Sequence, residues 1–142
     1  VAHASDKDQD SIYEFGKNLG IAFQLQDDYL DAFGDPKTFG KQVGGDIIEN
    51  KKTYLFLKAL EFSNDNDKVD LHQLFSSDPE DINTKIEVAK KFFISTGSAD
   101  ATKQAIQDYT NKAFTVLDAL NILEDKKLLL KAFGDHLMNR IV

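Results

Sequence analysis

Hydrophobic positions recur every three or four residues along most of the chain, which is the spacing of one face of an α-helix. The densest stretch runs from Tyr13 to Phe33, where apolar side chains wrap more than half of a helical wheel. We therefore expect a largely buried helix there. No extended stretch alternates strictly between apolar and polar residues, as half-buried β-strands do. The pattern predicts an all-α fold.

Five further helices are expected downstream, at about residues 50–62, 69–75, 79–96, 98–122 and 125–139. In the first of these, the pattern places Tyr54, Leu57 and Leu60 on the inward face. Asp78 is the expected N-cap residue of the helix that begins at Pro79, because an acidic cap followed by proline is a common helix start.

One long irregular segment separates the first two helices. Residues 34–45 hold four of the eight glycines and an Asp35-Pro36 turn signal. Glycine permits positive φ angles and lets the backbone approach a ligand closely. Long loops of this kind usually carry function or disorder, so this segment is a candidate binding loop.

Composition narrows the function classes. The 142 residues fit one domain, 1–142, and the formal net charge of −7 argues against a nucleic-acid partner. The absence of cysteine excludes disulfides, thiolate metal sites and cysteine nucleophiles.

No apolar run is long enough for a membrane span and no leader pattern is visible, so we expect a cytoplasmic protein. Because the chain starts at Val1 and its single methionine is Met138, we expect it to be part of a longer protein.

Three carboxylates share one stripe of the first helix. At 100° per residue, Asp27 and Asp31 lie about 40° apart, Asp28 and Asp31 about 60° apart, and Gln24 precedes Asp28 by one turn. Like charges at this spacing repel, and a divalent cation would offset that repulsion. Ligands that are all oxygens favour Mg²⁺ over zinc. The alternative is a solvated helix face with no ligand.

Positive charge follows the carboxylates in sequence. Lys41, Lys51 and Lys52 lie in or just after the glycine-rich segment. Carboxylates with Mg²⁺, followed by lysines and glycines, form the set of groups that a diphosphate needs.

These motifs resemble the second aspartate-rich region of the trans-isoprenyl diphosphate synthases, the polyprenyl synthetase family. The residues that carry the resemblance are Gly20-Ile-Ala-Phe-Gln-Leu-Gln-Asp-Asp-Tyr-Leu-Asp31, Gly34-Asp-Pro, Gly40-Lys41, Gly44-Gly-Asp46 and Asn50-Lys-Lys-Thr-Tyr54. The resemblance extends over the whole chain and covers the C-terminal portion of the family's helical bundle. It implies a Mg²⁺-dependent transferase that condenses isopentenyl diphosphate with an allylic diphosphate, and a homodimer when the protein is full length.

The resemblance also implies roles for single residues. Asp27 would be a Mg²⁺ ligand, with Asp28 and Asp31 as direct or water-mediated ligands. Asp27, Asp28 and Lys41 would be the catalytic residues. A fixed positive charge at these positions stabilises the negative charge that develops on a departing diphosphate.

Substrate-binding roles follow from the same resemblance. Lys41 and Lys51 would contact the allylic diphosphate, Gln24 would face the allylic substrate, and Phe23 would lie near the reacting chains. Lys52 has no role that the resemblance assigns firmly.

The chain departs from the family pattern in two respects. Leu55 follows Tyr54 where the family usually has proline, and the family's first aspartate-rich motif would have to precede Val1. We therefore expect this chain by itself to be inactive. Two alternatives stay open, namely a non-catalytic partner subunit of the same superfamily and a helical interaction module.

Overall fold

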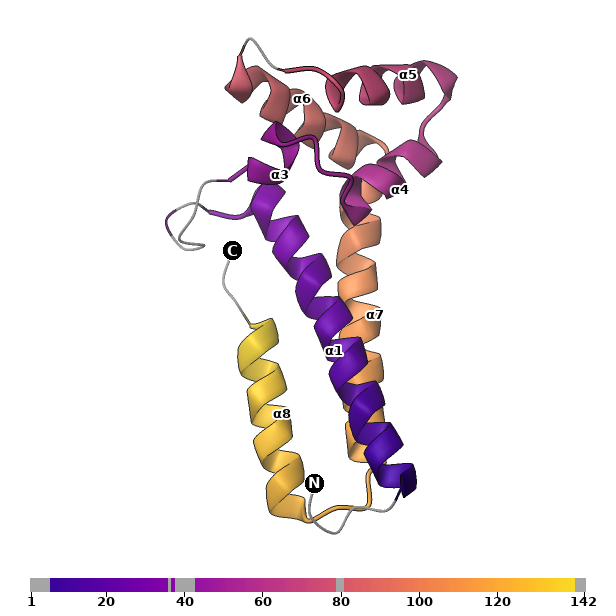
Figure 1. Cartoon of the computed structure of the whole chain (residues 1–142), viewed down its shortest axis with the longest axis vertical. Coiled ribbons are helices and arrows are strands. Elements are labelled where there is room, and N and C mark those ends of the chain that lie inside the picture. The colour runs from indigo at the N-terminus through magenta and orange to yellow at the C-terminus, as the bar shows by residue number, and fades with distance from the viewer. Residues whose placement is uncertain (1–5, 36, 38–42, 79–80, 140–142) are drawn as a thin grey trace. The chain divides into compact units, whose positions relative to one another are not determined.

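The computed structural model describes residues 6–35, 37, 43–78 and 81–139 (Figure 1). Within these ranges the chain forms helices and no strand, which confirms the predicted all-α class. The helices are α1 (Asp6–Phe33), α3 (Gly45–Ile48), α4 (Tyr54–Phe62), α5 (Asp65–Leu74), α6 (Ile82–Ser95), α7 (Ser98–Asp118) and α8 (Glu124–Met138). None of the helices in the described ranges combines the length and hydrophobicity that crossing a membrane requires.

The chain divides into two compact units, and both boundaries fall inside helices. Of the described residues, unit 1 contains 6–26 and 105–139, and unit 2 contains those between 27 and 104. The long helices α1 and α7 therefore contribute to both units.

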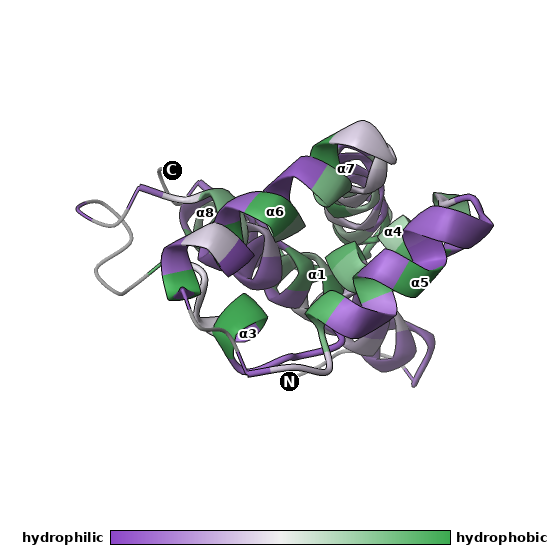
Figure 2. Ribbon diagram, turned by 90° about the horizontal axis from the view of Figure 1, so that it is seen from above, coloured by the Kyte–Doolittle hydropathy of each residue, from purple (hydrophilic) through white to green (hydrophobic). Residues whose placement is uncertain are grey.

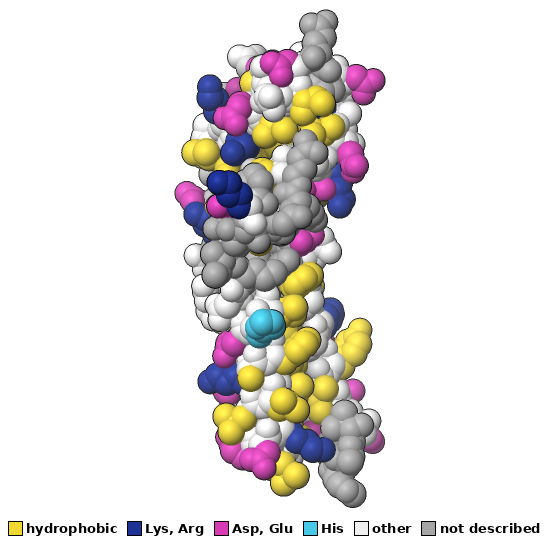
Figure 3. Space-filling model, turned by 90° about the vertical axis from the view of Figure 1, so that its left-hand side faces the viewer, with side chains coloured by type: hydrophobic (Ala, Val, Ile, Leu, Met, Phe, Trp, Pro, Cys, Tyr) yellow, Lys and Arg dark blue, Asp and Glu magenta, His cyan; other side chains and the backbone are white. Residues whose placement is uncertain are grey.

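Unit 1 packs segments of α1, α7 and α8 against one another. Its buried core consists of Phe15, Leu19, Ala113, Leu117 and Leu120, with partly buried side chains of α8 beside it. Other apolar side chains of α8 stay exposed, and Figure 3 shows hydrophobic side chains gathered on this face. The exposed large apolar residues of α8 are Leu128, Leu129 and Phe133.

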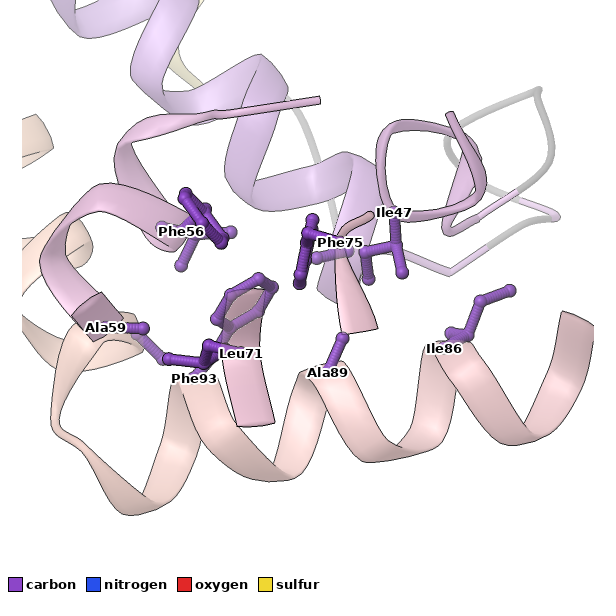
Figure 4. Packing of buried hydrophobic residues seen from close by; sticks show 11 residues of the cluster. Ile47, Phe56, Ala59, Leu71, Phe75, Ile86, Ala89 and Phe93 are labelled. Carbon is purple, nitrogen blue, oxygen red and sulfur yellow. The ribbon is translucent and has the colours of Figure 1, made fainter. Parts of the chain in front are cut away.

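Unit 2 is organised around α6, which packs against α3, α4 and α5. Figure 4 shows Ile86, Ala89 and Phe93 on one side of α6, directed toward Phe56, Phe75 and other apolar residues of the neighbouring helices. Phe93 is 1% exposed, and its full burial is worth about 1.5–3 kcal/mol. In Figure 2, α5 is largely hydrophilic, and its buried position is Leu71.

Helix α4 begins four residues later than the sequence pattern predicted. Thr53 is extended and its hydroxyl accepts a hydrogen bond from the Phe56 N–H at 3.4 Å, which sets the helix start. The predicted inward face is also wrong at Leu57, which is 53% exposed. The buried residues of α4 are instead Leu55, Phe56 and Ala59.

Two other helix starts differ from prediction. Helix α5 begins at Asp65, because the Asn64 side chain accepts a hydrogen bond from the Asp67 N–H at 2.8 Å. The cap of α6 is Asp81 and not Asp78, since the Asp81 carboxylate accepts from the backbone of Asn83 and Thr84. The Thr84 hydroxyl also donates to this carboxylate at 2.8 Å, and that bond lowers the pKa of Asp81. Pro79 lies outside the described residues.

Candidate functional site

The C-terminal end of α1 carries the three predicted carboxylates. Asp27 and Asp28 are half-buried, and Asp31 is only 6% exposed. Leu30 and Ala32, apolar neighbours on the same helix, are buried, and Ala32 belongs to the apolar core of unit 2. The helix therefore holds these carboxylates beside an apolar core.

Asp31 joins this helix end to the next element. Its carboxylate Oδ2 accepts a hydrogen bond from the Asp46 N–H at 2.9 Å, and its backbone carbonyl accepts one from the Gly44 N–H at 2.5 Å. A carboxylate at the first turn of a short helix satisfies an amide that would otherwise lack a partner. The side chain of Asp31 thus fastens α3 to α1.

Gly44 is required at this junction. Its φ angle is +91°, in the left-handed region that glycine adopts without strain. A Cβ atom at this position would lie 2.6 Å from Cδ1 of Ile86, which is too close. Glycine therefore lets α3 begin directly against α6.

Lys51 follows α3 and is tied to it. The Lys51 N–H donates to the Asp46 carbonyl at 2.8 Å, and its Nζ lies 3.7 Å from the Asp46 carboxylate. Its side chain remains 56% exposed. A chain of contacts thus leads from the carboxylate stripe to an accessible ammonium group. It runs from Asp31 to Asp46 and from Asp46 to Lys51.

Lys52 has a different environment from its neighbour. Its Nζ donates to the Phe75 carbonyl at 2.8 Å and lies 4.6 Å from the ring centroid of Phe56. It also lies 5.4 Å from the Phe75 ring centroid. A cation over aromatic faces and on a backbone carbonyl is held by the protein itself. Lys52 therefore fastens this segment to the C-terminal end of α5, while the residue as a whole stays exposed.

A buried lysine, which the sequence pattern did not predict as a site residue, completes this region. Lys85 of α6 is 4% exposed, and its Nζ donates to the side-chain oxygen of Asn50 and to the Ser77 carbonyl, the latter at 3.0 Å. Burial lowers the pKa of Lys85, Asp78 raises it, and Lys52 lowers it further. The sequence did contain a sign of this buried position, because Lys85 precedes Ala89 by one helical turn and so lies on the apolar face of its helix.

The remaining predicted residues are only partly placed. Lys41 lies outside the described residues. Phe23 is half-buried and Gln24 is exposed, and both belong to the part of α1 in unit 1. Within the described ranges, no three His, Cys, Asp or Glu side chains lie close enough together to hold a metal ion. Asp46, which has no predicted role beyond its place in the Gly44-Gly-Asp46 motif, links the acidic and basic groups.

Comparisons with known proteins agree on one family. The sequence profile of the polyprenyl synthetase family matches residues 1–92. A short chain isoprenyl diphosphate synthase of Methanocaldococcus jannaschii is 31% identical over 144 residues, covering 99% of this chain and 42% of that protein. The chain therefore spans less than half the length of this curated relative.

Solved structures give the same result. A geranylgeranyl pyrophosphate synthase superposes with a TM-score of 0.85 at 48% identity, covering 97% of this chain and 43% of that one. A geranylgeranyl pyrophosphate synthase of Corynebacterium glutamicum, solved with isoprenyl diphosphate and magnesium, superposes with a TM-score of 0.80 at 29% identity. That match covers 92% of this chain and 37% of the other.

Proposed function

Because the chain belongs to the polyprenyl synthetase family, we propose that it supplies part of the active site of a prenyltransferase. The reaction condenses isopentenyl diphosphate with an allylic diphosphate and releases a longer prenyl diphosphate. The observation that carries this proposal is the contact chain from Asp31 through Asp46 to Lys51. It links a carboxylate-bearing helix end to an accessible lysine, the two kinds of group that recognition of a metal-bound diphosphate requires.

The donor set fits magnesium. The candidate ligands Asp27, Asp28 and Asp31 offer only oxygen atoms, and Mg²⁺ commonly takes one or two protein carboxylates and fills its other positions with water and phosphate. A closed cluster of three ligands is therefore not needed. When bound, the ion would neutralise charge on the departing diphosphate.

The protein's own residues have separate tasks in this proposal. Lys51, together with Lys41, binds the diphosphate of the allylic substrate through charge-assisted hydrogen bonds. Positive charge fixed there favours the transition state, in which negative charge accumulates on the leaving group. Phe23 and Gln24 face the allylic substrate, and the apolar side chain of Phe23 helps to exclude water.

The test uses the complete gene product that contains this chain. We expect isothermal titration with pyrophosphate to give heat in the presence of Mg²⁺ and none after chelation. We also expect the Asp27→Asn variant to lose turnover of allylic and isopentenyl diphosphate by orders of magnitude with little change in folding. The matched control is Asp10→Asn, an exposed carboxylate on the same helix.

The outcomes separate the competing hypotheses. Absence of metal-dependent heat would contradict the proposal and favour a helical interaction module. Binding without turnover would favour a non-catalytic partner subunit. A homodimer of the full-length protein and a cytoplasmic location stay predictions, which sedimentation and cell fractionation test.

A further inference from the structure

Both neighbours of Lys51 in sequence are anchored to one turn of the chain. Asn50, whose φ angle is 58°, accepts a hydrogen bond from Lys85 through its side-chain oxygen. Lys52 donates to the carbonyl of Phe75. Lys85 donates in addition to the carbonyl of Ser77. The side chains on either side of Lys51 are thus held to residues 75–77, Lys52 directly and Asn50 through Lys85.

Lys85 is an unusual residue for the position that it occupies. It lies on the buried side of α6, adjacent to Ile86 and one turn before Ala89. Burying an ammonium group is unfavourable unless protein atoms replace the hydrogen bonds that it makes to water. An apolar side chain of similar length would avoid that penalty. The contribution of the amine therefore lies in the two oxygens that it binds, on Asn50 and Ser77.

The side chain of Lys51 itself makes few contacts. Its side chain is 56% exposed, and its ion pair with Asp46 is long, at 3.7 Å. Such a side chain has little packing of its own to restrict it, so the backbone at residues 50–52 determines where its ammonium group can reach. A charge that is already in position needs no reorganisation when an anion binds.

We propose that Lys85 is a positioning residue, which directs the Lys51 ammonium toward a bound diphosphate by holding Asn50 in its left-handed conformation. This inference rests on the proposed function, because it assigns Lys51 a diphosphate ligand. Lys85 itself does not touch the ligand in this arrangement, since its amine is engaged by Asn50 and Ser77.

A double-mutant cycle tests the inference in the complete gene product. The variants are Lys85→Met, Lys51→Met and the double substitution, and the readout is the Kd for pyrophosphate in the presence of Mg²⁺. We expect each single substitution to raise the Kd by about tenfold, the size of one lost charge-assisted contact. We expect Lys85→Met to have no further effect once Lys51 is replaced, because Lys85 acts through Lys51.

Two control variants separate positioning from general stability. Lys91→Met removes an exposed lysine of the same helix and should leave the Kd unchanged. Asn50→Gly removes the oxygen that Lys85 binds, and glycine adopts a positive φ angle without strain. Because the link to Lys85 is lost, the Kd should rise as it does in Lys85→Met. This variant tests the inference even if Lys85→Met fails to fold. Circular dichroism checks that each variant is folded at the titration temperature.

Each remaining outcome is decisive. Additive effects of Lys51→Met and Lys85→Met on the Kd would overturn the inference, because they would show that Lys85 acts independently of Lys51. An unchanged Kd in both Lys85→Met and Asn50→Gly would overturn it as well, while leaving the proposed function intact. Absence of Mg²⁺-dependent binding in the unsubstituted protein would overturn the proposed function, and this inference with it.

Discussion

The carboxylate of Asp31 combines two roles that substitution can separate. In the structure its Oδ2 accepts a hydrogen bond from the Asp46 N–H at 2.9 Å, and the side chain is 6% exposed. In the proposed function the same carboxylate contributes negative charge to a magnesium site. Asp31→Asn keeps an acceptor oxygen and removes the charge, whereas Asp31→Ala removes both.

The structure sets the expected magnitudes. Asp31→Ala leaves the Asp46 N–H without its partner in a partly buried position, so the free energy of unfolding should fall by about 1–2 kcal/mol. Asp31→Asn should lower it by less than about 1 kcal/mol, since a neutral acceptor replaces a charged one. Both variants should weaken Mg²⁺-dependent pyrophosphate binding to a similar extent, because both lose the charge.

Urea denaturation and isothermal titration of the same preparations measure the two effects. Equal losses of stability in Asp31→Asn and Asp31→Ala would refute the argument that the acceptor oxygen fastens α3. Full metal-dependent affinity in Asp31→Asn would remove Asp31 from the metal site and leave its structural role. Asp10→Asn, on the same helix and exposed, provides the control for loss of one negative charge.

Three other predictions concern the fold that supports the site. Gly44→Ala should destabilise the protein by about 1–3 kcal/mol in urea denaturation, because of the positive φ angle and the close contact that a Cβ atom would make with Ile86. Gly16→Ala is the matched control, because a Cβ atom there would have no neighbour within 4 Å. It should stabilise α1 by about 0.5–1 kcal/mol. Phe93→Ala should cost about 3–5 kcal/mol and lower the thermal midpoint measured by circular dichroism. The lowered pKa of Asp81 means that its capping contribution is complete above the unfolded value of 3.8 and is lost as the pH falls through the folded pKa. Asp81→Ala should therefore be less stable than the parent at neutral pH, and the difference should shrink in acid denaturation curves.

The sequence predicted helices well where their patterns were long and local. The helix ending at Phe33 and the last helix, predicted at 125–139 and found at Glu124–Met138, are confirmed. Errors occurred at helix starts, where several polar residues compete as caps. Asp78 and Asp81 are equally suitable caps by residue type, and only the fold shows that Asp81 receives the amide hydrogen bonds.

The site was predictable to the extent that it depends on one helix. Spacing alone placed Asp27, Asp28 and Asp31 on a common stripe, and all three lie in α1 as expected. The turn of Asp31 toward α3 was not predictable, because its partner lies 15 residues away beyond a glycine-rich segment. A contact of that kind depends on how α3 packs against α6, and local periodicity carries no information about it.

Lys52 and Lys85 both form hydrogen bonds to neutral groups, so neither positive charge is cancelled by a direct ion pair in these bonds. Lys52 and Lys85 satisfy their ammonium hydrogen bonds with carbonyl and amide oxygens, which order the side chains without cancelling their positive charge. Burial lowers the pKa of Lys85, Asp78 raises it, and the positive charge of Lys52 lowers it by less than Asp78 raises it, so the two ammonium groups influence each other. A ligand that binds the folded protein and not the unfolded chain stabilises the folded state. Binding of a diphosphate and stability of the fold should therefore be linked, so the protein should melt at a higher temperature when Mg²⁺ and pyrophosphate are present together than with either alone.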